Sequence, residues 1–169
     1  MDILWSPWRY DYIKSSGSGS RHDPNACIFC DIPAAPGTDV EKRILLRASF
    51  NYIILNIYPY ISGHLLIVPF AHLADLDAAS KESTDEMMDL SKRAQTALRD
   101  VYHPHGFNLG MNLGAAAGAG VAGHYHQHVM PRWSGDVNFM TAVSETRVVS
   151  EDLETTYAKL LPGFKGNSP

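Results

Sequence analysis

The chain has 169 residues, of which 45% are hydrophobic and 19% are charged, and these values are typical of one globular domain with a substantial core. Its formal net charge is −4 and its basic residues are scattered singly, which argues against binding to a nucleic acid polymer. No stretch approaches the roughly 20 apolar residues that cross a membrane, and the N-terminus lacks the apolar core of a signal peptide. We therefore expect a cytoplasmic protein that binds neither a nucleic acid polymer nor a membrane.

The N-terminal segment differs in composition from the rest of the chain. It contains Trp5, Trp8 and Tyr10, and residues 15–20 read SSGSGS, the composition of a flexible linker. We therefore divide the chain into an aromatic N-terminal segment with a flexible linker, residues 1–24, and one folded domain, residues 25–169.

Five segments of this domain have the apolar runs and the bounding turn residues of strands. The one long helical segment begins near Ser83, which fits a capping box with Glu86, and apolar residues then recur with a period close to 3.6. A second helix is expected over residues 150–161. Because most strands follow one another without a helix between them, the sequence predicts an α+β fold with a five-stranded antiparallel sheet, one long helix and a C-terminal helix. The expected strands are residues 43–49, 51–57, 64–69, 107–113 and 124–132.

The most informative motif lies in the last of these strands, where His124, His126 and His128 alternate with Tyr125 and Gln127. In an extended strand the three histidines project from one face, about 6.5–7 Å apart, and the other two residues project from the opposite face. An imidazole is both a nucleophile and a proton carrier near neutral pH. The motif therefore predicts a reactive site.

Other interpretations of the motif are open at this stage. Alternate histidines on a strand could chelate a catalytic metal, although metallohydrolases usually add carboxylate ligands and the nearest acidic residue is Asp136. The three histidines could also be structural residues of a half-buried strand. A third interpretation is a nucleotide-binding module without turnover.

The only two cysteines, Cys27 and Cys30, form a CxxC motif. Such a motif is half of a zinc site, a redox pair or two unrelated buried thiols. A redox pair usually begins a helix within a βαβ pattern, which this sequence does not show. A zinc half-site is therefore favoured, with the remaining ligands supplied by histidines.

A segment of small residues, GAAAGAGVAG at 114–123, separates the last two expected strands. It has almost no side chains, so its backbone N–H groups can approach a ligand closely. The segment is therefore a candidate phosphate-binding loop.

Taken together and in this order, the motifs resemble the histidine triad (HIT) family, and in particular its bacterial diadenosine tetraphosphate (Ap4A) phosphorylase branch. The resemblance covers about residues 4–162, nearly the whole chain. The string HYHQHVM fits the triad signature, and the opening LWSPWR and the later GDVNF look like the Ap4A phosphorylase branch. Further agreement comes from Asn56, Ser62-Gly63-His64, Asn112 and Pro131-Arg132-Trp133.

The resemblance implies a nucleotidyl hydrolase or transferase that cleaves a dinucleoside polyphosphate such as Ap4A at the α-phosphate of an adenine or other purine nucleotide. His126 would be the nucleophile and would form a covalent nucleotidyl-histidine. His128 would contact the phosphate and assist the leaving group, and His64 would lie beside the triad. The family also implies a homodimer.

The same resemblance assigns binding roles. Asn56 and Asn112 match positions that bind ribose or phosphate, and the amides of Ala119 and Gly120 would cradle the phosphates. Apolar side chains of the first strands are candidates for the nucleobase pocket. They include Ile53, Leu55 and Ile57.

In zinc-containing members of the family, the CxxC motif is joined by a histidine after the third strand and by the first triad histidine. The matching residues here are Cys27, Cys30, His72 and His124. The resemblance therefore implies a closed Cys₂His₂ structural zinc site and no organic cofactor. His124 would then be a metal ligand rather than a reactive group.

The sequence departs from the family pattern at the phosphate-binding loop. Related phosphorylases often carry Gly-Ser where this chain has Ala119-Gly120, so a phosphate-binding hydroxyl is missing. The Gln-Ser or Gln-Thr pair that is usual in hydrolysing branches is also absent. Both phosphate and water are thus open as the acceptor, and a nucleoside phosphoramidate hydrolase is an alternative activity.

Overall fold

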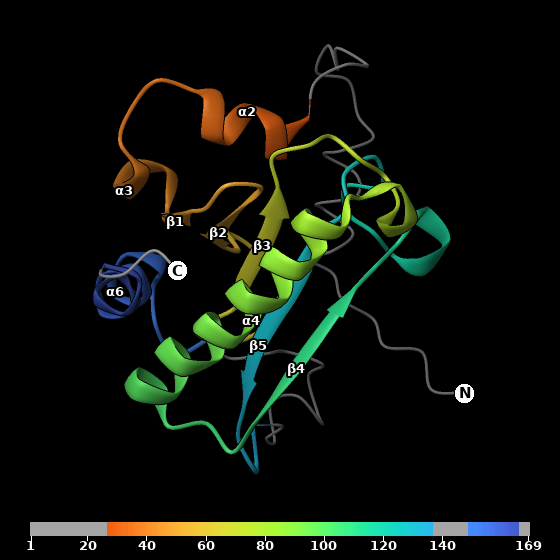
Figure 1. Ribbon diagram of the computed structural model, residues 1–169. Helices are drawn as coiled ribbons and strands as arrows, with labels where there is room; N and C mark the ends of the chain where they lie inside the picture. Colours follow the sequence, from red (N-terminus) through yellow and green to blue (C-terminus); the bar gives the residue numbers. More distant parts are fainter. Residues whose placement is uncertain (1–26, 137–148, 166–169) are drawn as a thin grey trace, which may run out of the picture.

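The computed structural model describes residues 27–136 and 149–165, so the expected N-terminal segment, residues 1–24, lies outside the described residues. Five antiparallel strands form one sheet in the order β1-β2-β3-β5-β4 (Figure 1). The predicted α+β fold and the five-stranded antiparallel sheet are confirmed. The strands are β1 (Ile44–Arg47), β2 (Asn51–Leu55), β3 (Leu65–Pro69), β4 (Gly106–Met111) and β5 (Gln127–Arg132).

Every strand is found where the sequence predicts one, but each is shorter than predicted. After β2, the backbone N–H of Tyr58 donates to the side-chain oxygen of Asn56 at 2.9 Å, and the chain turns there instead of continuing to residue 57. β1 is interrupted by a register shift between Ile44 and Leu46. β5 begins at Gln127, three residues later than predicted.

The long helix α4 (Lys81–Tyr102) lies across one face of the sheet (Figure 1). Its buried residues pack against strand residues that point to the same face, because residues two apart in a strand share a face. The C-terminal helix α6 (Leu153–Leu160) and the short helix η3 (Leu161–Phe164) contact α4. Together these helices and the strands enclose the main apolar cluster of the protein, which includes Ile53, Leu65, Ile67, Leu90, Leu98, Val129 and Leu160.

The predicted capping box at Ser83 and Glu86 is wrong. The helix begins two residues earlier, and the Oγ of Ser80 accepts a hydrogen bond from the N–H of Ser83 at 3.2 Å. The Glu86 carboxylate instead accepts hydrogen bonds from three consecutive amides of the β1–β2 turn, residues 49–51. Three unpaired amides satisfy a carboxylate better than one helix-terminal amide does, so the tertiary contact prevails over the local one.

The opposite face of the sheet carries the helix α2 (Ile28–Ala34), which the sequence did not predict, and the short helix α3 (Asp39–Lys42). Cys27 is the residue that precedes α2, so the CxxC motif does begin a helix, although not within a βαβ unit. A second apolar cluster lies on this face, and it consists of Cys27, Phe29, Ile44, Tyr52, Ile54, Leu66 and Val68.

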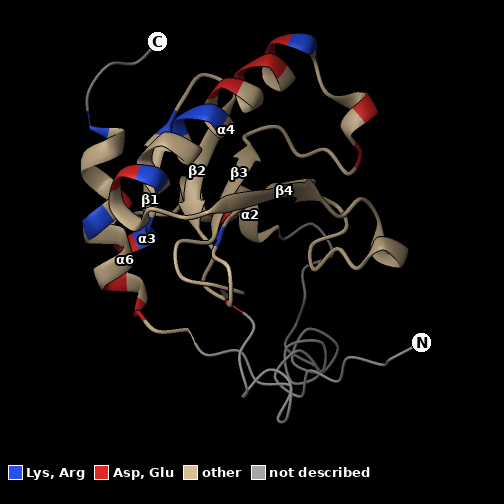
Figure 2. Ribbon diagram, turned by 90° about the horizontal axis from the view of Figure 1, so that it is seen from below, with Lys and Arg blue, Asp and Glu red and all other residues tan. Residues whose placement is uncertain are grey.

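The charged residues lie mostly on the helices, whereas the strands are nearly free of them (Figure 2). Most charged side chains of α4 are exposed to solvent, and Glu86, which binds the β1–β2 turn, is an exception. Among the described residues, no helix combines the length and the apolar character that crossing a membrane would require.

Candidate active site and candidate metal centre

The alternation predicted for the triad is confirmed. Tyr125 and Val129 are buried in the apolar cluster beneath α4, and Gln127 accepts a hydrogen bond there from the Oγ of Ser91 at 2.9 Å. The three histidines lie on the α2 face of the sheet, where His128 is paired in register with Leu66 of the second apolar cluster. Since the period of a strand is two residues, one short segment supplies both the core and the site.

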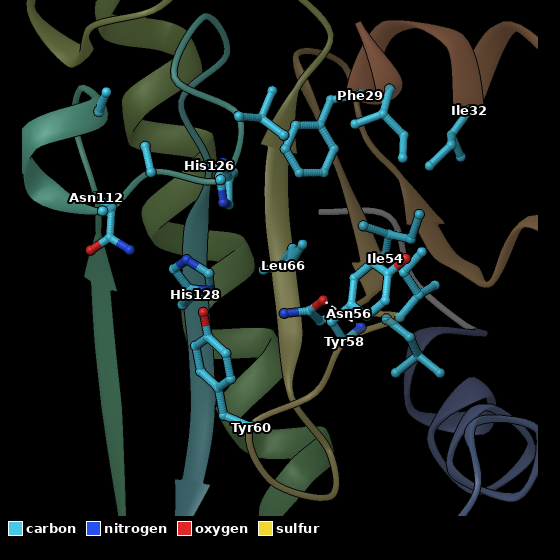
Figure 3. Close-up of a pocket in the computed structure, with 18 residues that line it drawn as sticks. Phe29, Ile32, Ile54, Asn56, Tyr58, Tyr60, Leu66, Asn112, His126 and His128 are labelled. Atoms are coloured by element: carbon cyan, nitrogen blue, oxygen red, sulfur yellow. Dashed lines mark hydrogen bonds between the residues drawn. The ribbon is translucent and has the colours of Figure 1, made fainter. Parts of the chain in front are cut away.

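A cavity of about 340 Å³ opens on the α2 face, within the usual range for a small-molecule site (Figure 3). One side is formed by α2, and the other by the end of β4, the segment 115–121 and the triad. None of the described residues that line it is Lys, Arg, Asp or Glu, so a bound anion must be held by histidines, amides and backbone N–H groups. The lining residues are Ile28, Phe29, Ile32, Ile54, Leu55, Asn56, Ile57, Tyr58, Tyr60, Leu66, Asn112, Ala115, Gly118, Ala119, Gly120, Val121, His126 and His128.

The protonation of His126 follows from one hydrogen bond. Its Nδ1 lies 3.1 Å from the backbone carbonyl oxygen of His124, and a carbonyl can only accept, so Nδ1 carries the proton. The other ring nitrogen, Nε2, then holds a free lone pair, and His126 lines the cavity. Burial lowers the pKa of His126, and the hydrogen bond to this carbonyl opposes that shift in part.

The protonation of His128 follows from a longer chain of contacts. The backbone N–H of Tyr60 donates to Nδ1 of His64 at 3.2 Å, so in the neutral ring the proton of His64 is on Nε2. That nitrogen lies 2.9 Å from Nδ1 of His128, which must therefore accept. His128 consequently carries its own proton on Nε2, a buried atom that has no hydrogen-bond partner among the described residues.

His128 is the most strongly perturbed member of the triad. Burial, together with the neighbouring His126, lowers its pKa to about 4. The ring is therefore neutral at physiological pH, and its Nε2–H is available as a donor to whatever occupies the cavity. His64 is 1% exposed and does not line the cavity, so it acts on the site through the lining residues that it contacts, His128, Asn56 and Tyr60.

The structure places Asn56, Asn112, Ala119 and Gly120 on the wall of the cavity, as the sequence predicts for substrate-binding residues. The Nδ2 of Asn56 lies 3.3 Å from Nδ1 of His64, so this amide also orients the histidine pair. The two loop amides differ, since the N–H of Ala119 donates to the carbonyl of Gly114 at 3.3 Å. The N–H of Gly120 makes no hydrogen bond within the described part of the chain.

Sequence reasoning missed several residues of the cavity. Phe29 and Ile32 come from α2, which was not predicted, and Tyr60 stacks on His128 with ring centroids 6.1 Å apart. Ile53 is not part of the pocket, because it points to the α4 face and packs in that core, whereas its neighbour Ile54 lines the cavity. The alternation of β2, counted from a correctly placed strand, would have identified Ile54 as the lining residue.

Cys27, Cys30, His72 and His124 come together beside the cavity, and their ligand atoms all lie within 4.8 Å of one another. The Nδ1 of His124 is 3.3 Å from the Sγ of Cys27 and 3.5 Å from that of Cys30, and the Nδ1 of His72 is 3.4 Å from the Sγ of Cys30. Sulfur and nitrogen ligands of a tetrahedral zinc ion are about 3.6 Å apart, given Zn–S and Zn–N distances of about 2.3 and 2.05 Å. The four residues therefore fit a metal ion.

The tautomer of His124 agrees with this arrangement. Its Nε2 lies 2.9 Å from the backbone carbonyl of Pro69, so Nε2 carries the proton and Nδ1 directs a lone pair at the two sulfurs. Burial lowers the pKa of His124, which favours the neutral ring that a metal requires. Its role is thus distinct from that of His126.

The fold and the alternating histidines can be compared with those of known protein families. The HIT domain matches residues 38–135, and the chain belongs to the HIT family. Among curated relatives, the AP-4-A phosphorylase of Mycobacterium tuberculosis is 36% identical over 158 residues, which cover 90% of this chain and 79% of the relative. The adenosine 5'-monophosphoramidase of Saccharomyces cerevisiae is 32% identical over 108 residues, or 63% of each chain.

Solved structures agree with this assignment. A zinc-bound histidine triad family protein from Mycobacterium smegmatis superposes with a TM-score of 0.66 at 29% identity, and the match covers 82% of this chain and 93% of that one. A hypothetical histidine triad nucleotide-binding protein from Sulfolobus tokodaii has a TM-score of 0.65 at 24% identity and supports the fold alone, over 82% and 92% of the two chains.

Proposed function

We propose that this protein cleaves dinucleoside polyphosphates such as Ap4A at the α-phosphate, through a covalent nucleotidyl-His126 intermediate. The observation that carries the proposal is the hydrogen bond from Nδ1 of His126 to the His124 carbonyl, which leaves Nε2 as the nucleophilic nitrogen. Family membership and the phosphorylase and phosphoramidase relatives support a nucleotide hydrolase or transferase activity.

In the first step, Nε2 of His126 attacks the α-phosphorus of Ap4A. The new N–P bond forms as the P–O bond to the leaving nucleotide breaks, and ATP departs with the electron pair of that bond. The substituted ring retains its proton on Nδ1 and becomes cationic, and the His124 carbonyl that accepts this proton stabilises the charge. No additional base is required, because the ring is neutral and unprotonated at Nε2 before the attack.

His128 acts on the leaving group. Its Nε2–H is buried and without a partner among the described residues, so it is free to donate to the oxygen on which negative charge develops. Such a donor is already oriented before the reaction, because the contact of His64 with Nδ1 fixes the tautomer. In the second step, the oxygen of water or phosphate attacks the α-phosphorus on the side opposite the N–P bond. The N–P bond breaks and its electron pair returns to Nε2, which restores neutral His126. Attack by water gives AMP and releases one proton to the solvent, and attack by phosphate gives ADP.

The rest of the cavity would hold the nucleotide. Its apolar wall suits a purine ring, and Asn56, Asn112 and the free N–H of Gly120 would bind ribose and phosphate. The wall consists of Ile28, Phe29, Ile32, Ile54, Leu66 and Val121.

Product analysis tests the reaction. Ap4A is incubated with the enzyme with and without orthophosphate, and the nucleotides are separated by anion-exchange chromatography. ADP plus ATP that forms only with phosphate identifies a phosphorylase, and AMP plus ATP in both conditions identifies a hydrolase. The absence of cleavage in both conditions contradicts the proposal.

The nucleophile is tested separately with His126→Gly. This variant should not cleave Ap4A, but it should convert adenosine 5'-phosphorimidazolide, which supplies the N–P bond already formed. The control is His103→Asn, an exposed histidine in a left-handed conformation that asparagine tolerates. It should cleave Ap4A at the wild-type rate. Cleavage of Ap4A by His126→Gly at near the wild-type rate would rule out the covalent step.

A second candidate is nucleoside phosphoramidate hydrolysis. It is favoured by the yeast monophosphoramidase relative. Here His126 attacks the same phosphorus and the P–N bond to the amine breaks. A kcat/KM for adenosine 5'-phosphoramidate that exceeds the value for Ap4A would make this the principal activity.

We also propose that the metal is zinc, bound by Cys27, Cys30, His72 and His124. When bound, the ion would supply structural cross-linking, because four protein ligands leave no open position for a substrate. Elemental analysis of the purified protein should find one zinc per chain. Protein that contains no zinc after purification in zinc-supplemented medium would contradict this assignment.

The oligomeric state is proposed to be a homodimer, as the family resemblance implies. In the described structure β4 is an edge strand with one unpaired side, and Leu109 on it is 39% exposed. Light scattering coupled to size exclusion should give a mass of twice that of the chain, and a monomer at micromolar concentration would contradict the proposal.

A further inference from the structure

Helix α2 belongs to both sites. Cys27, which precedes it, and Cys30 within it supply two members of the metal cluster. Ile28, Phe29 and Ile32 line the cavity, and residues three and four apart lie on the same side of a helix. Helix α2 and the residue before it thus provide two of the four residues of the metal cluster. The helix also provides part of the apolar wall of the cavity, including Phe29 and Ile32 (Figure 3).

Phe29 makes the contact between the two sites. Its ring centroid lies 5.7 Å from that of the metal-cluster residue His124 and 4.7 Å from that of the proposed nucleophile His126. The side chain is 7% exposed, and the Phe29 carbonyl accepts a hydrogen bond from the hydroxyl of Tyr52 at 2.7 Å. A displacement of α2 would therefore alter the cavity wall and the packing of the His126 ring together.

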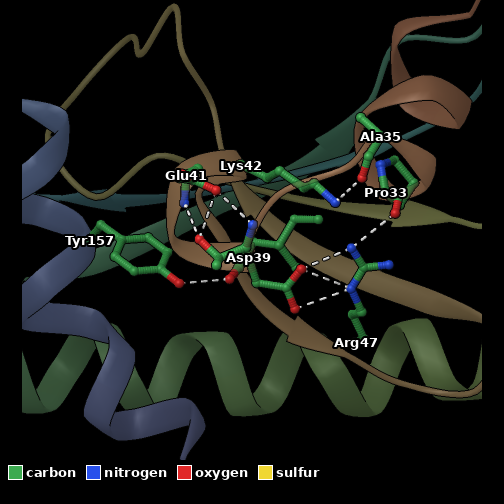
Figure 4. Close-up of polar contacts among 9 residues, drawn as sticks. Pro33, Ala35, Asp39, Glu41, Lys42, Arg47 and Tyr157 are labelled. Carbon is green, nitrogen blue, oxygen red and sulfur yellow. Dashed lines mark hydrogen bonds and ion pairs between the residues drawn. The ribbon is translucent and has the colours of Figure 1, made fainter.

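The remaining attachments of α2 are weak. A helix of seven residues is not stable by itself in water. At its C-terminal end, Arg47 donates to the Pro33 carbonyl at 3.1 Å, and Lys42 contacts the Ala35 carbonyl (Figure 4). Both contacts are exposed, and water competes for the same groups, so they restrain the helix less than buried contacts do. In the described structure, the N-terminal end is held mainly by burial of Cys27 and Phe29 and by the metal cluster.

We infer that metal binding at the cluster and nucleotide binding in the cavity are thermodynamically linked through α2. The inference rests on the proposed nucleotide and metal sites and adds the coupling between them. A bound metal fixes Cys27 and Cys30, and with them the residues of α2 that line the cavity. In the metal-free protein, α2 must become ordered when the nucleotide binds. The cost of this ordering weakens the observed binding of the nucleotide. Linkage is reciprocal, so a bound nucleotide must strengthen metal binding by the same factor.

The test uses AMP as the probe and the full chain in two states. AMP affinity is measured by calorimetry on zinc-loaded protein and on protein stripped by a chelator, and circular dichroism confirms that the stripped chain is folded. Zinc affinity is measured by competition with a chromogenic chelator, with and without saturating AMP. We expect AMP to bind about tenfold more weakly after stripping, within the usual range of coupling factors, and zinc to bind more tightly with AMP by that same factor.

Two matched variants assign the coupling to α2. Ile32→Ala and Ile57→Ala delete the same atoms from the cavity wall, but Ile57 lies after β2 and is 40% exposed. Both should weaken AMP binding to zinc-loaded protein. Only Ile32→Ala should also lower the coupling factor, because only Ile32 belongs to the helix that the metal holds. An equal coupling factor in both variants overturns the route through α2.

The possible failures are distinguishable. Zinc-loaded protein that does not bind AMP contradicts the proposed nucleotide site, and a chain that does not retain zinc contradicts the metal site; either result also removes the linkage. Binding of both ligands with a coupling factor of one contradicts the linkage alone. Loss of the far-UV circular dichroism signal after the metal is stripped would show that the whole chain unfolds, and this result would overturn the linkage through α2.

Discussion

Two consecutive residues of β5, one on each face of the sheet, differ in how their buried polar groups are paired. On the α4 face, Gln127 is 6% exposed and its side-chain oxygen is paired with the hydroxyl of Ser91. On the α2 face, the next residue, His128, is 9% exposed, and its Nε2 has no partner within the described residues. An unpaired buried polar atom costs about 1–3 kcal/mol. The buried hydroxyl of Tyr125 on the α4 face also has no partner within the described residues, so an unpaired group is not peculiar to one face. His128 differs in that it lines the cavity, where a ligand can accept from its donor.

The largest expected effect separates the two faces by function. His126→Ala should lower kcat for Ap4A by roughly 10³-fold or more and change the free energy of unfolding little, because the ring borders a cavity. Val129→Ala, on the α4 face and 0% exposed, should cost about 2–3 kcal/mol of stability and leave kcat unchanged below its Tm. Urea unfolding and steady-state kinetics on both variants check this. A catalytic defect in Val129→Ala at 15 °C, where it is folded, would break the comparison.

The second effect concerns the proposed metal, which would directly stabilise only the α2 face. Cys27→Ala should lose the metal and at least about 3 kcal/mol of stability, since binding to the folded state adds to the free energy of unfolding. For a chain of this length the loss corresponds to a fall in Tm of roughly 6–12 °C. Differential scanning calorimetry measures it. A chelator should lower the wild-type Tm equally and should not affect Cys27→Ala, whereas a chelator-sensitive Cys27→Ala would contradict the assignment.

The third effect is a dependence of stability on pH that originates from His128. Its pKa is about 4 in the folded protein and about 6.5 when unfolded, so below pH 6.5 the unfolded state binds the proton more readily. Its contribution is fully present above pH 6.5 and is lost as the pH falls to 4, a change on the order of 3 kcal/mol. The groups that face this ring are Tyr60, His64 and His126.

The measurement compares the free energy of unfolding of the wild type and His128→Asn between pH 4 and pH 7. Acid loss of the metal affects both proteins, so it cancels in the difference. Wild type should lose more stability than the variant as the pH falls. Parallel curves would show that His128 titrates normally.

The smallest effect tests the paired group of the α4 face. The hydrogen bond is removed in Ser91→Ala, in Gln127→Met and in the double variant. A double-mutant cycle on their free energies of unfolding should give a coupling energy of about 1 kcal/mol between the two side chains. None of these variants should alter kcat. A change in kcat for Gln127→Met would show that the two faces communicate through β5.

Sequence reasoning identified the features that follow from the local periodicity of a strand or helix. It missed the features that depend on contacts between residues far apart in the chain. The alternation of His124, His126 and His128 assigns their face without knowledge of the fold, because a strand permits only two faces. Glu86 was assigned to the wrong partners because the amides that it binds are more than 30 residues away in the chain. Helix α2 was missed because seven residues that include Pro33 show too little periodicity. The CxxC motif predicted two members of the candidate metal cluster but not that the helix it begins forms part of the cavity wall.

The two hydrogen bonds that fix the tautomers of the triad end on main-chain atoms, the N–H of Tyr60 and the C=O of His124. Side-chain substitution at position 60 leaves that amide in place, and only proline would remove it. The location of the proton on His126 is therefore a property of the backbone path, and the location of the proton on His128 requires one further side chain, that of His64. Residues around the cavity can diverge to suit new leaving groups, in evolution or in the laboratory, without reassigning which nitrogen attacks and which one donates.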